Sequence, residues 1–286
     1  AEDVTGGAAD DTFYGSEGAD TYDGAGAGTN GNLVDYSGTV SGLTPTEGIN
    51  LAFNSGSLGG TTYALSNGDK LTNIQKVIGT SFADTVNLTG YNNAFTFVTG
   101  NGADSYTGGS SVDTVDLKTG RTTDLSGVNI QGGAGDDVVI VDQARLSGAG
   151  AFTLSGDGSS NNSGSNDTLQ FWAASGGTLN LSTIIASNNS KYQFFETLDL
   201  SKDTAASSIT ISTDWIKALV DANPGTLPSL YIKLSTTIGD TYSIGTASGE
   251  TATTLSAGLV KGIHSSLVSF KDSFGSDVAK AYIQYV

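Results

Sequence analysis

Hydrophobic and polar positions follow a nine-residue pattern in several parts of the chain. It is clearest between Thr99 and Asp116, where two consecutive units each place glycine-rich residues before the sequence Asp-x-apolar, with Asp104 and Asp113 at equivalent places. Glycine favours turns and alternating polarity favours strands, so each unit predicts a turn followed by a short strand. Because side chains alternate along a strand, the apolar residue of each unit is expected in the core.

Similar units occur on both sides of this stretch. Their sixth residue carries a side-chain oxygen: Asp11, Asp20, Asn32, Asp84, Asp137 and Asp167. With the two central units included, the residues expected in the core are Phe13, Tyr22, Val34, Val86, Tyr106, Val115, Val139 and Leu169. The segment Gly132–Ile140 matches the nonapeptide G-G-x-G-x-D-x-U-x most closely, whereas the units at Asn32 and Asp167 contain insertions.

Longer alternating segments interrupt the pattern. Between Ser37 and Lys76 we expect wider coils of the same stack, with extended segments at Ile49–Phe53 and Leu71–Val77. Beyond Gln170, short strands are expected at Leu179–Ile185, Thr197–Leu200, Ser208–Ile211 and Leu230–Leu234.

A helix is expected from Asp214 to Val220, because Ser212 or Thr213 can cap it and Pro224-Gly225 closes it. The final segment, Leu255–Val286, mixes helical and strand patterns and is expected to cap the stack, since an open end coil needs cover.

The sequence therefore predicts an all-β fold, a right-handed parallel β-roll or β-solenoid with glycine-rich turns and one or two short helices in the C-terminal third. Residues 1–170 are expected to form the β-roll with irregular wider coils. Residues 171–286 are expected to continue it with the inserted helix and the C-terminal cap, as one continuous domain.

Composition narrows the set of partners. The chain has 12 Lys and Arg against 29 Asp and Glu, a formal charge of −17, so it repels nucleic acid and anionic membranes and attracts metal cations. It has no Cys for disulfides and no apolar run long enough to span a membrane. The missing initiator Met and the start at Ala1 indicate a piece of a longer polypeptide.

Calcium is the cation that these units favour, because it binds several carboxylate and carbonyl oxygens at once. Glycines let a turn point successive carbonyls inward, and the Asp adds charge. Stacked turns would align equivalent Asp residues with ions bridging them, and Asp104 and Asp113 are expected to act together at the central site. The expected ligands are Asp11, Asp20, Asp23, Asn32, Asp84, Gly100, Gly102, Asp104, Gly108, Asp113, Gly132, Gly133, Gly135, Asp137 and Asp167. At Asn32 the missing charge is expected to weaken binding. The alternative for a single unit is an ordinary turn in which Asp caps the backbone.

These nonapeptides, together with the segments Leu71–Thr85 and Phe195–Leu200, resemble RTX proteins, in particular the large surface adhesins that Gram-negative bacteria export by type I secretion. The resemblance implies a right-handed parallel β-roll with calcium in its turns, which extends or anchors adhesive modules outside the cell. Ser, Ala or Asn replaces many glycines of the nonapeptide, so we expect a few strongly bound ions instead of a complete row.

The resemblance implies a non-catalytic, calcium-dependent module of an extracellular or cell-surface adhesin that presents a surface to a glycan or peptide ligand or to neighbouring domains of the same chain. The alternatives are the calcium-folding C-terminal secretion module of an RTX enzyme or toxin, and an S-layer-type lattice protein. Catalysis by this chain is not expected, because it has no Cys and a single histidine, His264, without catalytic partners around it in the sequence.

Overall fold

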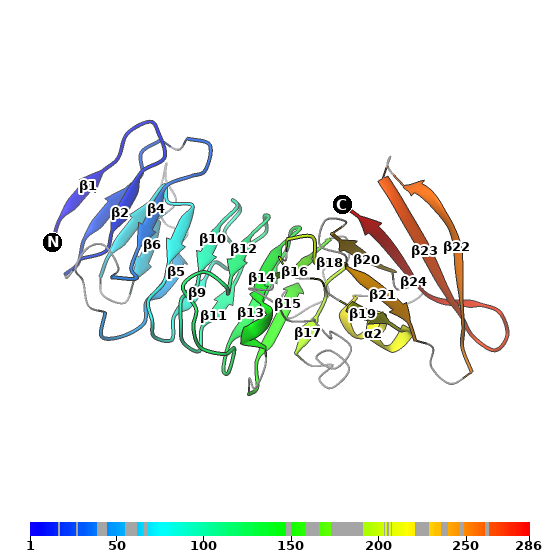
Figure 1. Cartoon of the computed structure of the whole chain (residues 1–286). Coiled ribbons are helices and arrows are strands. Elements are labelled where there is room, and N and C mark those ends of the chain that lie inside the picture. Colours follow the sequence, from blue (N-terminus) through cyan, green and yellow to red (C-terminus); the bar gives the residue numbers. More distant parts are fainter. Residues whose placement is uncertain are drawn as a thin grey trace.

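The computed structural model describes residues 1–16, 18–26, 28–38, 45–54, 62–65, 68–146, 150–157, 166–172, 191–202, 204, 206, 208–220, 229–235, 240–245, 249–260 and 263–286. This part of the chain is nearly all β and is dominated by two large sheets of mainly parallel strands. The molecule is elongated, with the N-terminus at one end and strands β22 and β23 at the other (Figure 1).

The first sheet, called sheet A here, has ten strands. In spatial order they are β1 (Asp3–Thr5), β3 (Thr21–Asp23), β7 (Lys70–Thr72), β6 (Thr62–Leu65), β5 (Asn50–Asn54), β9 (Thr85–Asn87), β11 (Ser105–Thr107), β13 (Asn129–Gly133), β15 (Thr153–Asp157) and β17 (Tyr192–Gln193).

The second sheet, sheet B, has twelve strands. They are β2 (Thr12–Tyr14), β4 (Leu33–Asp35), β8 (Lys76–Ile78), β10 (Thr96–Val98), β12 (Thr114–Asp116), β14 (Val138–Asp142), β16 (Thr168–Trp172), β18 (Thr197–Asp199), β20 (Ser229–Leu234), β24 (Asp277–Tyr285), β23 (Ile263–Lys271) and β22 (Thr251–Val260). Strands β19 (Ser208–Ile211) and β21 (Thr241–Ile244) form a separate parallel pair, and a short 3-10 helix, η1, covers Gln143–Arg145.

Successive strands alternate between the two sheets from β8 to β18, and each pairs in parallel with the strand that follows it in its own sheet. Tyr106 of β11 lies opposite Ile130 of β13 in sheet A, and Val115 of β12 lies opposite Val139 of β14 in sheet B. These partners are 24 residues apart, whereas Thr96 of β10 and Thr114 of β12 are 18 apart. One circuit of the chain, with one strand in each sheet, therefore takes two nine-residue units where no insertion lengthens it. This alternation is consistent with a solenoid.

The core lies between the sheets and contains the apolar residue of each unit. The structure confirms this prediction for Phe13, Tyr22, Val34, Val86, Tyr106, Val115, Val139 and Leu169, all of which are buried. Phe97 of β10 stacks on Tyr106 of β11 across the two sheets, with ring centroids 6.0 Å apart. The middle residue of a three-residue strand points inward, so a single large side chain per unit fills the core.

The region between Ser37 and Lys76 differs from the predicted wider coils. Strands β5, β6 and β7 pair antiparallel and insert a hairpin into sheet A, while β4 and β8 remain direct parallel neighbours in sheet B. The predicted extended segment Leu71–Val77 is divided between β7 and β8. The division falls at Asn73, whose φ of 54° turns the chain from one sheet to the other.

The C-terminal third contains strands close to the predicted positions at β18, β19 and β20, whereas the predicted strand Leu179–Ile185 lies outside the described residues. Helix α2 (Thr213–Leu219) occupies the stretch where a helix was predicted, and Ile216 and Leu219 are buried. None of the described helices is long and apolar enough to cross a membrane.

The final segment forms strands and not the predicted mixture of helix and strand. Strand β24 pairs in parallel with β20, and β23 and β22 follow it in antiparallel order. Ala279, Ala281 and Ile283 are buried at alternate positions of β24, and this two-residue period fits a strand and not a helix. The side chain of His264 lies outside the described part of this segment.

Replacing Phe97 by alanine should lower the free energy of unfolding by about 3–5 kcal/mol, because it removes a buried ring, and with it the stacking contact to Tyr106, from the space between the sheets. Chemical denaturation followed by circular dichroism measures this loss. Phe274→Ala is the control: Phe274 is 92% exposed, and its replacement should change stability by less than about 0.5 kcal/mol. Equal effects of the two changes would contradict the core described above.

Candidate functional site

The sixth residue of each unit lies in the turn before its strand, and these turns alternate between two edges of the stack. We call the row before the strands of sheet A the A-edge ladder and the row before those of sheet B the B-edge ladder. The A-edge ladder contains Asp20, Asp69, Asp84 and Asp104. The B-edge ladder contains Asp11, Asn32, Asp113, Asp137 and Asp167. Asp104 and Asp113 lie on opposite edges, so the structure does not bring them together as the sequence predicted.

Each ladder is held by hydrogen bonds from the backbone to the side chains of the neighbouring turn. On the A edge, the Asp84 N–H donates to Oδ1 of Asp104 at 3.0 Å. On the B edge, the Asp113 N–H donates to Oδ1 of Asp137, and the Asp137 N–H donates to Oδ1 of Asp167, both at 2.7 Å. One oxygen of each of these buried carboxylates is therefore used to link successive turns.

The second carboxylate oxygen usually has a donor within the protein. These donors are the Gly7 N–H for Asp11, the Ser16 hydroxyl for Asp20, the Tyr36 hydroxyl for Asp69, the Thr80 N–H for Asp84 and the Gly109 N–H for Asp113. Asp69 was not among the predicted site residues, because no complete nonapeptide precedes it.

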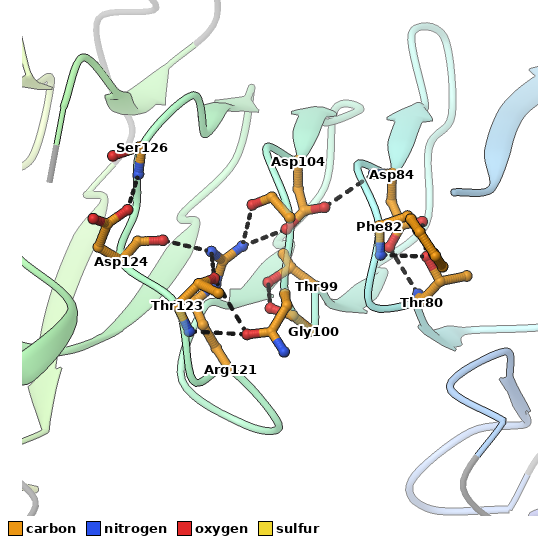
Figure 2. A network of polar contacts seen from close by, with 12 residues as sticks. Thr80, Phe82, Asp84, Thr99, Gly100, Asp104, Arg121, Thr123, Asp124 and Ser126 are labelled. Carbon is orange, nitrogen blue, oxygen red and sulfur yellow. Dashed lines mark hydrogen bonds and ion pairs between the residues drawn. The ribbon is translucent and has the colours of Figure 1, made fainter. Parts of the chain in front are cut away.

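Asp104 has a charged partner that the sequence did not predict (Figure 2). The Arg121 guanidinium forms an ion pair with Oδ2 of Asp104 and donates through the same Nη2 to the Gly102 carbonyl at 3.0 Å, and both charged side chains are fully buried. Nη1 donates to the Asp124 carbonyl at 2.9 Å. Burial raises the pKa of Asp104, and the charge of Arg121 opposes that shift. A basic residue inside a glycine-rich acidic region is the only sequence signal for this contact.

Asn32 also differs from the prediction. Its Nδ2 donates to three carbonyls, those of Gly24 at 3.1 Å, Gly26 at 2.6 Å and Asn73 at 2.9 Å. Its Oδ1 accepts the Asp11 N–H at 2.9 Å. The NH₂ group of Asn32 therefore faces the carbonyls of this turn as a hydrogen-bond donor. The oxygen that was expected to bind a metal weakly accepts a backbone N–H instead.

Asp137 differs from Asp11 and Asp113 of the B-edge ladder. It is 2% exposed, and its Oδ2 is buried without a hydrogen-bond partner among the described residues. Burial raises the pKa of Asp137 to about 8; the Asp113 N–H opposes this shift, and the charges of Asp113, Asp167 and Asp157 add to it. Burial and the neighbouring carboxylates therefore disfavour a negative charge on Asp137 unless a cation compensates it.

The turn around Asp137 is also tight. A Cβ atom on Gly132 would lie 2.0 Å from the Gly156 carbonyl oxygen and 2.5 Å from Oδ2 of Asp137. Both oxygens thus lie close to Gly132, where the backbone leaves no room for a side chain. Two acceptor oxygens that lie close together favour a donor or a cation between them.

The other predicted glycines line turns of the same kind. Gly100 and Gly102 precede β11 at the A edge, and Gly108 precedes β12 and Gly135 precedes β14 at the B edge. Gly132 and Gly133 were predicted in a turn but are the last two residues of β13, where Gly133 pairs with Asp157 of β15. Gly102 has a φ of 120°, and a Cβ on it would meet the Phe82 carbonyl oxygen at 2.3 Å. Asp23 lies outside both ladders, at the end of β3, where Oδ1 accepts the Ala25 N–H and an amide N–H of Asn73.

In the described part of the chain, no group of three or more His, Cys, Asp or Glu side chains could hold a metal ion by itself. The ladder explains this, since successive acidic residues are spaced by one turn and one oxygen of each accepts a backbone N–H. An ion in these turns would need backbone carbonyls as well as carboxylates.

A scan against models of known protein families finds no match for this chain, and a search of curated proteins finds none either. The function is therefore inferred from the chemistry of the two ladders.

Gly132→Ala should destabilise the fold by about 1–3 kcal/mol or more, because the added methyl group meets the backbone of the next coil, which has no room to move. Gly7→Ala is the matched control in an equivalent turn, where a Cβ would meet nothing within 4 Å. Thermal denaturation of the two variants makes the comparison. A Gly132→Ala protein as stable as Gly7→Ala would refute the close approach of the turns.

In buffer free of divalent cations, stability should fall as the pH rises from about 5 to about 8.5. The folded-state pKa of Asp137 is raised from 3.8 to about 8 and those of Asp84 and Asp113 to about 6, so folding favours their protonated forms. That stability is complete below the unfolded pKa and is lost as the pH passes the folded values.

Melting temperatures measured across this range test the prediction. Asp137→Asn should flatten the upper part of the curve and should be more stable than the parent at pH 8, because its amide can donate to the Gly156 carbonyl. A parent protein whose melting temperature is constant over the range would contradict the charge concentration around Asp137.

Proposed function

We propose that this chain is a non-catalytic, calcium-dependent module of a secreted bacterial surface adhesin, a right-handed β-roll that folds on calcium outside the cell and extends or presents an adhesive surface. The observation that carries the proposal is the buried Oδ2 of Asp137, which has no hydrogen-bond donor in the described structure and shares its turn with the Gly156 carbonyl.

The residues of this turn fit calcium. Calcium takes six to eight oxygen ligands, including carboxylates and backbone carbonyls, in flexible geometry. Asp137 and the Gly156 carbonyl would hold the ion, with Asp113 and Asp167 as the adjacent carboxylates that contribute charge. When bound, the ion supplies the positive charge that the turn lacks. No redox or hydrolytic chemistry follows from it.

The overall charge supports folding outside the cell. A formal charge of −17 and buried carboxylates destabilise the compact state where calcium is scarce. An ion that binds only the folded turns shifts the equilibrium towards the native state where calcium is abundant. The elongated stack in Figure 1 suits a module that spaces or presents other surfaces.

Calcium should raise the stability of the parent protein. With a dissociation constant of roughly 10⁻⁴ to 10⁻³ M, typical of extracellular modules, about 10 mM calcium adds about 1.4–2.7 kcal/mol. Calorimetric titration and melting curves measure the binding and the shift, with magnesium at the same ionic strength as the control. Asp137→Asn should remove the response and still fold. A parent protein that neither binds nor responds to calcium would refute the proposal.

The kind of longer protein to which this chain belongs can be tested separately, from the sequence of the gene around the segment that encodes it. Tandem immunoglobulin-like repeats upstream support the adhesin, whereas an adjoining catalytic domain would instead indicate a secretion module of an enzyme or toxin.

A further inference from the structure

Two turns of the stack carry a nitrogen donor where the Asp137 turn has none. At Gly24, a Cβ would lie 2.1 Å from Nδ2 of Asn32 and 2.5 Å from the Asn73 carbonyl oxygen. At Gly132, the corresponding atoms are Oδ2 of Asp137 and the Gly156 carbonyl oxygen. In both turns a ladder side chain and a backbone carbonyl oxygen lie close to a glycine, and the nearest side-chain atom is an amide nitrogen in the first and a carboxylate oxygen in the second.

Arg121 plays the corresponding part on the other edge. Its Nη2 lies between a carboxylate oxygen of Asp104 and the Gly102 carbonyl, the two kinds of oxygen that would face a cation in a turn (Figure 2). The guanidinium carries a permanent positive charge, and its side chain is completely buried. It reaches this position from the loop between β12 and β13.

We infer that Asn32 and Arg121 are built-in replacements for a cation, so that the chain itself restricts calcium to the turns around Asp137 and excludes it from the turns of Asn32 and Asp104. The inference rests on the proposed function for the identity of the ion. According to this inference, Asn32 and Arg121 determine which turns need no calcium, because each supplies the donor or charge that an ion would otherwise supply.

Arg121→Ala tests the A edge. Removing the guanidinium leaves Asp104 and the Gly102 carbonyl facing a buried space, so the variant should bind one more calcium ion per chain than the parent and show a larger rise in melting temperature with calcium. Native mass spectrometry and calorimetric titration with calcium chloride count the ions. Arg121→Lys, which keeps a positive charge, should gain none. The double variant Arg121→Ala, Asp104→Asn should lose the added ion, which places it at this turn.

Asn32→Asp tests the B edge with a side chain of nearly the same shape. It exchanges the donor that faces the Gly24, Gly26 and Asn73 carbonyls for an acceptor, so this variant too should gain one calcium ion. Because the change is isosteric, the variant should fold in calcium whatever happens to Arg121→Ala.

The outcomes separate this inference from the proposed function. A parent protein without calcium binding, combined with a gain in both variants, would refute the proposed function and the calcium site at Asp137, and would support the role of Asn32 and Arg121 as replacements for a cation. A parent that binds calcium, combined with an unchanged ion count in both variants, would refute the inference alone. An Arg121→Ala protein that stays unfolded at about 10 mM calcium also counts against it, since calcium at that concentration should replace the lost charge.

Discussion

The hydrogen bond from one turn to the carboxylate or amide of the next is the interaction on which the stack depends. Most of the ladder carboxylates, such as those of Asp84, Asp104 and Asp137, are buried away from water, so their polar groups must be satisfied within the protein. A side-chain oxygen from the next coil accepts the N–H at several steps of both ladders, as between Asp84 and Asp104 and between Asp113 and Asp137. Because the same bond brings acidic residues together in a low-dielectric interior, it also creates the need for a compensating charge.

That need is met differently along the chain. Backbone and hydroxyl donors serve most second oxygens, the guanidinium of Arg121 serves Asp104, and the amide of Asn32 removes the charge altogether. Around Asp137 three further carboxylates contribute to the electrostatic environment, and the described residues supply Oδ2 with no donor. The same repeated geometry thus contains turns whose carboxylates find donors within the protein, and the turn of Asp137, where the described residues provide none for Oδ2.

The strands and the core could be predicted from the sequence because both are local properties of the nine-residue unit. Tyr106 and Val115 are buried for the same reason, two residues after an Asp that ends a glycine turn. The edge on which each Asp lies depends on pairing between distant strands, such as Thr96 with Thr114, and the pattern alone did not reveal it. Arg121 reaches Asp104 across 17 residues, and the β5 to β7 hairpin arises from antiparallel pairing that the unit does not encode.

The B-edge ladder has an apolar residue in one turn, and this has a mechanical consequence. Phe95 lies directly before β10, and its N–H donates to Oδ1 of Asp113 in the following coil. Its ring is buried in the core and has no oxygen that could accept an N–H from the preceding coil. In a stack, each coil is coupled mainly to its neighbours. On this edge, tension along the long axis would therefore be resisted between β8 and β10 by strand pairing and by the packed core, with no contribution from a side-chain hydrogen bond at Phe95.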